Sequence, residues 1–366
     1  MRRVNIQDLK LGMVIARPIY SSDGRILLQT GISLDEEYIR RLKEMGITSI
    51  YIRDKFLDEV DDIPDVVSEK TRIAATKLIG DNFKQLEKQH KINTRAITNM
   101  VNNIIDELLS NSKILVHLSD IRAFDDYTFA HSVNVCILSI MTGITLGYNE
   151  LKLKELGLGA LLHDVGKIKI DKKILNKPGD LTKEEFNEVK NHTEYGFEIL
   201  RKYDDIPLLS AHIAYQHHER WDGNGYPRGL AGRNIHEYAR IVAVADVYDA
   251  LLDYRPYRPS YTVTQAITII KRMAGIYLDT SCVSSLIANI AVYPIGSIIE
   301  LNSGEIGVVV DVNKETPTKP VVKILYSRNQ KRISHPYEVD LSKFSTVVVA
   351  KSLSEEEISR LRNNSP

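Results

Sequence analysis

The middle of the chain, from about residue 119 to 290, alternates apolar segments with polar turns. Within these segments apolar residues recur every three or four positions, which places them on one face of a helix. The pattern predicts an all-helical core, with helices over residues 133–146, 151–162, 186–200, 241–252 and 263–273.

The first 53 residues contain shorter segments of β type. Residues 13–15 and 25–28 are short segments of β type, apolar except for Arg25, and they flank a polar turn sequence that ends in Asp23-Gly24. Since Asp-Gly supplies the positive φ angles of a tight turn, we expect a hairpin here. A helix and a strand, over residues 33–45 and 49–52, complete a small α+β module.

An acidic stretch at residues 58–62 and Pro64 separate this module from a helical pattern over residues 66–118. Clustered carboxylates and proline are typical of the start of a helix. The helices in this region either connect domains or pair with a second subunit. A homodimer formed through residues 66–118 is therefore a hypothesis.

After residue 293 the pattern changes to β-branched runs, at 297–301, 307–310 and 321–325, which predict a small barrel or meander. The expected fold class is mainly α, with an all-helical domain flanked by a small N-terminal α+β module and a small C-terminal β module. The predicted boundaries are 1–53 for the N-terminal module, 54–118 for a helical linker, 119–293 for the helical domain and 294–366 for the C-terminal β domain and tail.

Composition limits the classes of partner and location. Lys plus Arg equals Asp plus Glu at 48 each, so no global field draws the chain to nucleic acid or an anionic membrane. We therefore expect no DNA, RNA or membrane partner, and any basic site must be local. The two cysteines are far apart and the N-terminus lacks an apolar signal segment. These features predict a cytoplasmic protein without disulfides.

Candidate chemistry concentrates in the helical middle, where six of the ten histidines lie between His131 and His218. His163-Asp164 ends an apolar helical run. Adjacent helix residues point about 100° apart, so the pair could face one metal ion, or Asp164 could bridge two. Two bridged cations about 3.5–4 Å apart are typical of two-metal phosphoryl chemistry. His217-His218-Glu219 repeats the tandem arrangement.

These residues also have structural interpretations. A lone histidine such as His131 or His192 is more often a surface or hydrogen-bonded side chain than a ligand. Asp246 interrupts the apolar run 241–245, and a buried carboxylate is costly unless it is paired or coordinated. Spacing alone does not show that these side chains converge.

The sequence around these residues resembles the HD-GYP family of metal-dependent phosphohydrolases. The resemblance rests on four segments: His163-Asp164-Val165-Gly166-Lys167, His217 to Pro227 with its Gly-Asn-Gly-Tyr-Pro end, Asp246-Val247-Tyr248-Asp249, and Arg255-Pro256-Tyr257-Arg258. It implies that the helical domain is a catalytic domain of the HD superfamily. Known members hydrolyse cyclic di-GMP to pGpG or GMP, which is the activity implied here.

The resemblance also implies which residues form the site. The implied metal ligands, with Asp164 bridging, are His131, His163, Asp164, His192, His217, His218 and Asp246. Imidazole and carboxylate ligands without thiolate suit Fe or Mn, so two divalent ions of this kind are expected. They would acidify a bridging water for attack on phosphorus. Asp164 and Lys167 are implied in catalysis, and substrate binding is implied for Lys167, Gly225, Tyr226, Arg255 and Arg258.

Two departures from the family pattern qualify this interpretation. Tyr127 stands where some members have a glutamate that helps to hold a third metal, so two metals are expected. Leu278-Asp279-Thr280 stands where many members have Phe-Asp-Pro, which affects local packing. Two alternatives to the phosphodiesterase stay open: a weakly catalytic effector that binds a cyclic dinucleotide, and an enzyme acting on another cyclic dinucleotide or nucleotide.

Overall fold

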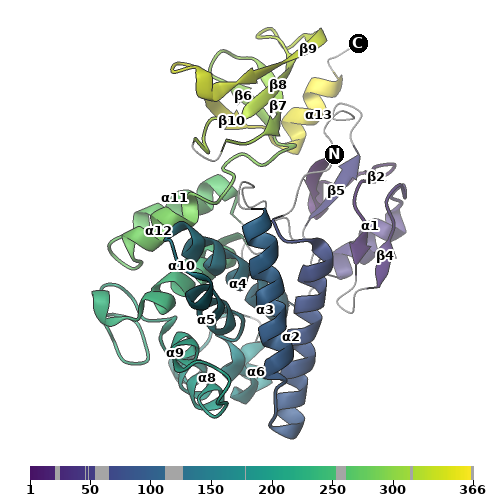
Figure 1. Ribbon diagram of the computed structural model, residues 1–366. Coiled ribbons are helices and arrows are strands. Elements are labelled where there is room, and N and C mark those ends of the chain that lie inside the picture. The colour runs from purple at the N-terminus through teal and green to yellow at the C-terminus, as the bar shows by residue number, and fades with distance from the viewer. Residues whose placement is uncertain are drawn as a thin grey trace. The chain divides into compact units, whose positions relative to one another are not determined.

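The computed structural model describes residues 1–20, 25–45, 47, 49–53, 66–111, 127–177, 179–252, 261–313 and 316–363. The chain divides into two compact units (Figure 1). One unit comprises Val67–Ser112 and Asp126–Asn289, and the other comprises Met1–Val66, Lys113–Asp125 and Ile290–Pro366.

Apart from two isolated β-bridges, every secondary-structure element described in the first unit is a helix, which confirms the predicted all-helical domain. Its elements are α2 (Glu69–Gln89), α3 (Thr94–Ser110), α4 (Tyr127–Thr145), α5 (Glu150–Leu161), η4 (Val165–Lys169), α6 (Lys172–Leu175), α7 (Lys183–Lys190), α8 (His192–Leu200), α9 (Leu208–Gln216), η5 (Gly232–Asn234), α10 (Glu237–Leu252), α11 (Val263–Met273) and α12 (Thr280–Ile287).

The helix predicted over residues 186–200 is wrong as a single element, because the structure divides it into α7 and α8. Asn191 is both the last cap of α7 and the first cap of α8. Its backbone stays in the right-handed helical region, with φ −62° and ψ −16°. No glycine or proline marks the break between the two helices, so the apolar periodicity runs through it. The break places His192 at the start of α8.

Helix α4 is the buried centre of this unit and packs against α2, α5, α10 and α12. Phe83 of α2 meets Phe129 of α4 edge to face, with ring centroids 5.5 Å apart. Val101 of α3 is fully buried and lies against Gly157 of α5. The helices predicted as a linker therefore belong to the core of the helical unit, while the homodimer through them stays a prediction.

The N-terminal module contains a small sheet in the order β1-β5-β2, formed by β1 (Arg2–Asn5), β2 (Val14–Ile15) and β5 (Ser49–Arg53). A separate pair joins β3 (Ile19–Tyr20) and β4 (Ile26–Leu28), and the module also contains η1 (Ile6–Asp8) and α1 (Glu36–Glu44). The predicted hairpin is therefore wrong in its first strand, because Val14 and Ile15 pair with β5 and leave residues 19–20 to pair with β4. The predicted turn residues 21–24 and Gly46 lie outside the described residues.

The C-terminal module is an antiparallel sheet in the order β10-β6-β7-β8-β9. Its strands are β6 (Ile298–Leu301), β7 (Ile306–Asp311), β8 (Val321–Tyr326), β9 (Arg332–Asp340) and β10 (Val349–Ser352), followed by α13 (Glu355–Asn363), with η6 (Leu341–Lys343) between the last two strands. Strands β6 to β9 are neighbours in chain order, so the predicted meander is confirmed. Apolar side chains are buried on both faces, with Val308 in one cluster and Val309 in the other.

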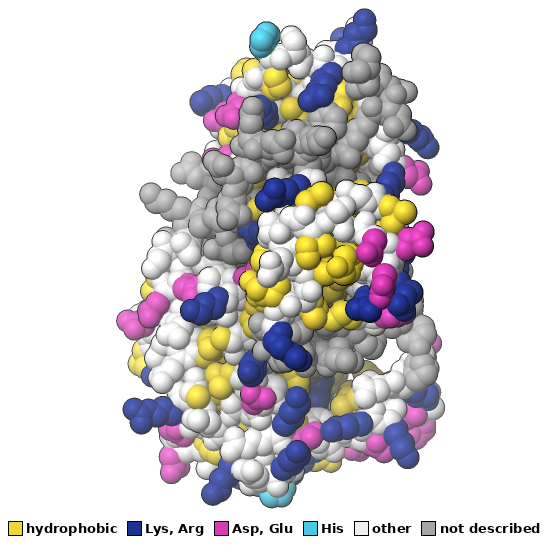
Figure 2. Space-filling model, turned by 90° about the vertical axis from the view of Figure 1, so that its right-hand side faces the viewer, with side chains coloured by type: hydrophobic (Ala, Val, Ile, Leu, Met, Phe, Trp, Pro, Cys, Tyr) yellow, Lys and Arg dark blue, Asp and Glu magenta, His cyan; other side chains and the backbone are white. Residues whose placement is uncertain are grey.

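No helix in the described part of the chain is long and apolar enough to cross a membrane. On the face drawn in Figure 2, basic and acidic side chains are interspersed among the described residues. Neither sign forms a continuous field there, in keeping with the zero net charge.

Candidate metal centre

The seven predicted ligands come from five helices of the helical unit. His131 lies within α4 and Asp246 within α10, while the others lie at helix ends. His163 and Asp164 follow α5, His192 begins α8, and the adjacent His217 and His218 follow α9. Helix ends suit this purpose because the chain direction changes there and consecutive side chains diverge.

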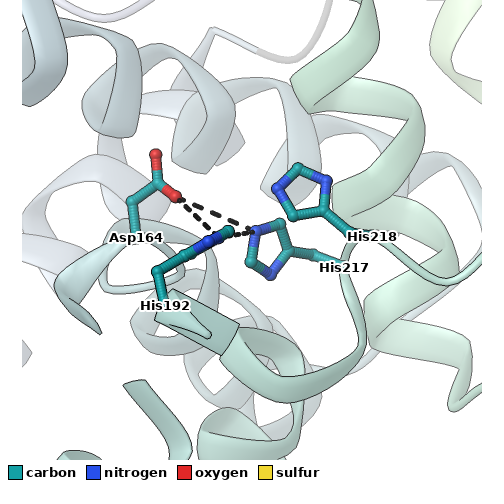
Figure 3. A group of neighbouring side chains, drawn as sticks. All are labelled: Asp164, His192, His217 and His218. Carbon is teal, nitrogen blue, oxygen red and sulfur yellow. Dashed lines mark hydrogen bonds and ion pairs between the residues drawn. The ribbon is translucent and has the colours of Figure 1, made fainter. Parts of the chain in front are cut away.

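The structure brings six of these side chains, all but Asp246, together in two groups that share one carboxylate. Asp164, His192, His217 and His218 offer ligand atoms within 4.8 Å of one another. Figure 3 shows these four side chains. His131, His163 and Asp164 form a second group by the same measure. A carboxylate common to two ligand groups is the arrangement expected of a site for two cations.

Distances to the Asp164 carboxylate show how closely the imidazoles surround it. Its oxygens lie 3.4 Å from Nε2 of His163, 3.5 Å from Nε2 of His192 and 3.8 Å from Nε2 of His217. Asp246 closes the other side of the site, because its two oxygens lie 3.1 Å from His131 Nε2 and 4.0 Å from His218 Nδ1.

Three of the imidazoles are oriented by a backbone carbonyl of the helix that precedes them. Nδ1 of His163 donates to the Ala160 carbonyl at 2.8 Å, Nδ1 of His192 to the Val189 carbonyl at 2.6 Å, and Nδ1 of His217 to the Ala214 carbonyl at 3.0 Å. A carbonyl oxygen only accepts, so each Nδ1 carries the proton. The Nε2 atoms are then the ones that face the cluster, and in the neutral form of this tautomer Nε2 offers the lone pair that a metal ligand requires.

Two buried atoms of the cluster have no hydrogen-bond partner among the described residues: Asp164 Oδ1 and His163 Nε2. Their residues are only 1 % and 0 % exposed. An unsatisfied buried polar atom costs about 1–3 kcal/mol, and more when it is charged. Divalent cations held by these atoms would satisfy both, so the residues fit a metal centre.

The pKa values favour the metal-binding protonation states for most of the cluster. Burial lowers the pKa of His192, lowers that of His217 further, and lowers that of His218 to about 3. Burial opposes ionisation of Asp164, but Lys167 and the adjacent imidazoles hold its pKa well below the usual range. Neutral imidazoles thus surround an ionised carboxylate.

His131 behaves differently because two carboxylates flank it. Burial acts to lower its pKa, but the contacts with Asp246 and Asp249 outweigh burial and raise the pKa to about 10. Nδ1 of His131 lies 2.6 Å from Asp249, whose other oxygen accepts from the Asn134 amide at 2.7 Å. Arg72 of α2 in turn donates to the Asn134 side-chain oxygen at 3.3 Å.

Asp249 is a residue of this site to which the sequence analysis assigned no role. It is 2 % exposed and orients His131 in the way that outer carboxylates orient metal-binding histidines. The available signal was its position three residues after Asp246, since residues at that spacing share a helix face.

Glycines allow the helices that carry the ligands to approach closely. A Cβ on Gly166 would lie 1.9 Å from the His192 carbonyl oxygen, so only glycine lets η4 contact the start of α8. A Cβ on Gly159 would lie 2.3 Å from Ile213 Cδ1 and 2.7 Å from the Ser210 carbonyl, where α5 crosses α9. The first contact brings His192 to Asp164, and the second brings the end of α5 to α9.

The predicted substrate-binding residues lie next to the cluster where the structure describes them. Lys167 Nζ is 2.5 Å from Asp164 Oδ2. The Tyr226 ring lies 4.8 Å from the His218 ring, and its backbone N–H donates to the His218 carbonyl at 3.2 Å. Gly225 has a structural reason to be glycine, because its Cβ would lie 2.3 Å from the Arg220 nitrogen. Arg255 and Arg258 lie outside the described residues.

Buried Glu219 fixes the loop that follows His218. Its carboxylate accepts from the Arg228 and Leu230 backbone N–H groups at 2.8 and 2.9 Å. Asp279, in the segment that departs from the family pattern, caps α12 and pairs with Arg240 at 2.6 Å. The segment that departs from the family pattern is therefore held by a helix cap and an ion pair of its own.

Comparison with known families agrees with the geometry. Residues 94–282, about half of the chain, match the HD domain family. The chain therefore belongs to the HD domain family. Residues 298–361, which contain the C-terminal sheet, match a KOW domain associated with HD domains.

Several curated relatives are similar over the same region. A cyclic di-GMP phosphodiesterase of Pseudomonas aeruginosa is 34 % identical over 71 % of this chain and 63 % of its own length. One of Thermotoga maritima is 41 % identical over 53 % of this chain and 52 % of its own. A 3'3'-cGAMP-specific phosphodiesterase of Vibrio cholerae is 36 % identical over 45 % of this chain and 36 % of its own. These similarities confirm the resemblance to HD-GYP proteins, although the matches span only 36–63 % of these relatives.

Proposed function

We propose that the chain is a metal-dependent phosphodiesterase that hydrolyses cyclic di-GMP to pGpG, GMP or both. The observation that carries the proposal is the Asp164 carboxylate, which is buried, ionised and common to two groups of imidazoles. The names of the P. aeruginosa and T. maritima relatives support cyclic di-GMP as the substrate.

In this proposal the clustered side chains would hold two divalent cations, Fe or Mn, and Asp164 would be common to both ligand groups. The proposed ligands are His131, His163, Asp164, His192, His217, His218 and Asp246. When bound, such cations supply an acidified water and polarise a phosphoryl oxygen. The chain's own contribution is to hold the imidazoles and ionised carboxylates at fixed distances, so that they need not rearrange as charge develops.

Lys167 is proposed to act at the phosphate. Its Nζ already contacts Asp164, and its side chain is 32 % exposed, so the ammonium group can meet both the ligand carboxylate and an incoming anion. Gly225 and Tyr226 are proposed to border the substrate because their loop contacts His218. Arg255 and Arg258 are assigned to phosphate binding on the sequence motif alone.

A second substrate has a specific observation in its favour. The relative from V. cholerae is named for 3'3'-cGAMP, which differs from cyclic di-GMP in one base. The two substrates share the phosphodiester chemistry, so the ligand cluster serves either one. The choice between them must come from contacts to the bases.

The test is hydrolysis by the full chain loaded anaerobically with Fe or with Mn. We expect cyclic di-GMP to give pGpG or GMP on chromatography, with 3'3'-cGAMP cleaved more slowly. Asp164→Asn and His163→Ala should lose both bound metal and turnover. His335→Gln, at an exposed histidine of the C-terminal sheet, is the matched control and should lose neither. Absence of product with both metals would leave the chain as a dinucleotide-binding effector and refute the proposal.

A further inference from the structure

An exposed aromatic side chain lies close to the candidate metal centre without belonging to the core. Phe186 of α7 is 45 % exposed. Its helix does not need Phe186 to hold its place, because Thr182 and Glu185 form a capping box and Lys177 pairs with Glu185 at 2.6 Å. An exposed large aromatic on a short, independently anchored helix is the kind of feature that marks a binding surface.

A cation accompanies this ring. Lys190 follows Phe186 by one helical turn, and its Nζ lies 4.7 Å from the Phe186 ring centroid and 5.8 Å from the Tyr226 ring centroid. The same Nζ is 3.1 Å from the Asn187 side-chain oxygen. Because no carboxylate neutralises Lys190 in its described contacts, its charge is available to an anion.

Tyr226 connects this pair to the metal centre. The Phe186 ring meets the Tyr226 ring edge to face, with centroids 6.3 Å apart. The Tyr226 ring lies 4.8 Å from that of His218 and 6.5 Å from that of His192. A continuous aromatic path therefore leads from the surface of α7 to two of the proposed ligands, with Lys190 beside it.

We propose that Phe186 and Lys190 form a nucleobase subsite, an inference that rests on the proposed phosphodiesterase function. The face of Phe186 that Lys190 does not cover stacks on one base of the dinucleotide, and the Lys190 ammonium group meets a phosphate oxygen of the same nucleotide. Every base offers a π face, so stacking supplies affinity that a base-free sugar phosphate cannot obtain. The dinucleotide would thereby contact the protein at two places, with a phosphodiester at Lys167 and a base at Phe186 of α7.

The experiment compares two ligands that differ only in the base. GMP and ribose 5-phosphate are titrated calorimetrically into the Mn-loaded full chain. Both carry the phosphate, so the ratio of their dissociation constants isolates the base. Alanine substitutions at stacking aromatics are worth about 5- to 150-fold in affinity per base. We expect wild type to prefer GMP by a factor in this range.

Three variants test the assignment. Phe186→Leu keeps an apolar side chain and should reduce the GMP preference at least fivefold, and Phe186→Trp should restore it. Lys190→Gln should weaken both ligands. Phe344→Leu, at a phenylalanine that is 46 % exposed in the C-terminal module, is the matched control and should change neither.

The outcomes separate this inference from the proposed function. An unchanged GMP preference in Phe186→Leu, or an equal loss for both ligands, overturns the base subsite. Failure to hydrolyse cyclic dinucleotides together with a Phe186-dependent GMP preference refutes the phosphodiesterase but supports the subsite. Hydrolysis that is normal in wild type and in Phe186→Leu, with the same KM, supports the enzyme and refutes the subsite.

Discussion

Replacing Gly166 with alanine is the sharpest test of how the metal centre is assembled. The added Cβ would lie 1.9 Å from the His192 carbonyl oxygen and 2.5 Å from the Gly196 nitrogen. Both are backbone atoms of α8, so no side chain can rotate away. Ordinary contacts begin at 3.4 Å, so relief needs the carbonyl to move by about 3.4 − 1.9 = 1.5 Å.

Overpacking of a well-packed core costs about 1–3 kcal/mol, and a clash with two backbone groups of one helix belongs at the upper end, about 3 kcal/mol. A shift of this size at the start of α8 also carries His192 away from Asp164, which it approaches at 3.5 Å. We therefore expect Gly166→Ala to lower both the free energy of unfolding, measured in urea, and the metal content, measured by elemental analysis.

Gly143→Ala is the matched control. Its Cβ would meet Leu153 Cδ2 at 2.9 Å and Leu156 Cδ2 at 3.0 Å, which are the ends of flexible side chains. Alanine also gains up to about 1 kcal/mol over glycine within a helix. The control should change stability by less than about 1 kcal/mol and keep its metal. If Gly166→Ala matched Gly143→Ala in both measurements, close packing of η4 on α8 would not be what positions His192.

Three further predictions concern the ligands and the residues that orient them. Asp249→Asn should weaken Mn binding about 10- to 100-fold, because it removes a carboxylate that orients a metal-binding histidine. Titration of Mn into protein stripped of metal by a chelator would measure the change. Metal-free protein should lose stability as the pH rises from 6.5 through about 10, because the raised pKa of His131 favours the folded state only while the imidazole is protonated. Urea midpoints across that range should flatten in His131→Gln, and a slope that persists would contradict this cause. Mn at 100 times its dissociation constant should stabilise the metal-free protein by about 2.7 kcal/mol, and Asp164→Asn should remove this gain.

The helical core and the ligand residue types could be predicted from the sequence because both are local signals. Apolar periodicity marked both ends of α5 to within one residue, and it marked the end of α10 but not its first turn. The tandem pairs His163-Asp164 and His217-His218 were visible as pairs, and the family pattern supplied their order along the chain.

The rest depended on tertiary contacts that leave little trace in one sequence. The turn between α7 and α8 has neither glycine nor proline, so its periodicity looks continuous. Strand β4 pairs with residues 19–20 because Val14 and Ile15 pair with β5 instead. No local turn pattern specifies that pairing. Gly166 is part of the family motif, but its need for glycine lies in the His192 carbonyl, far away in the sequence.

Orientation and distance in this centre are therefore controlled separately. The rings of His163, His192 and His217 are each tied to a carbonyl three residues back, so their orientation is a property of the local turn. Their separation depends on how closely helices cross, which Gly159 and Gly166 permit. Substitution of Gly159 or Gly166, where two helices approach closely, should thus leave each imidazole correctly oriented but too far from its neighbours. Metal affinity would then fall while the histidine tautomers, observable by nitrogen NMR, stay unchanged.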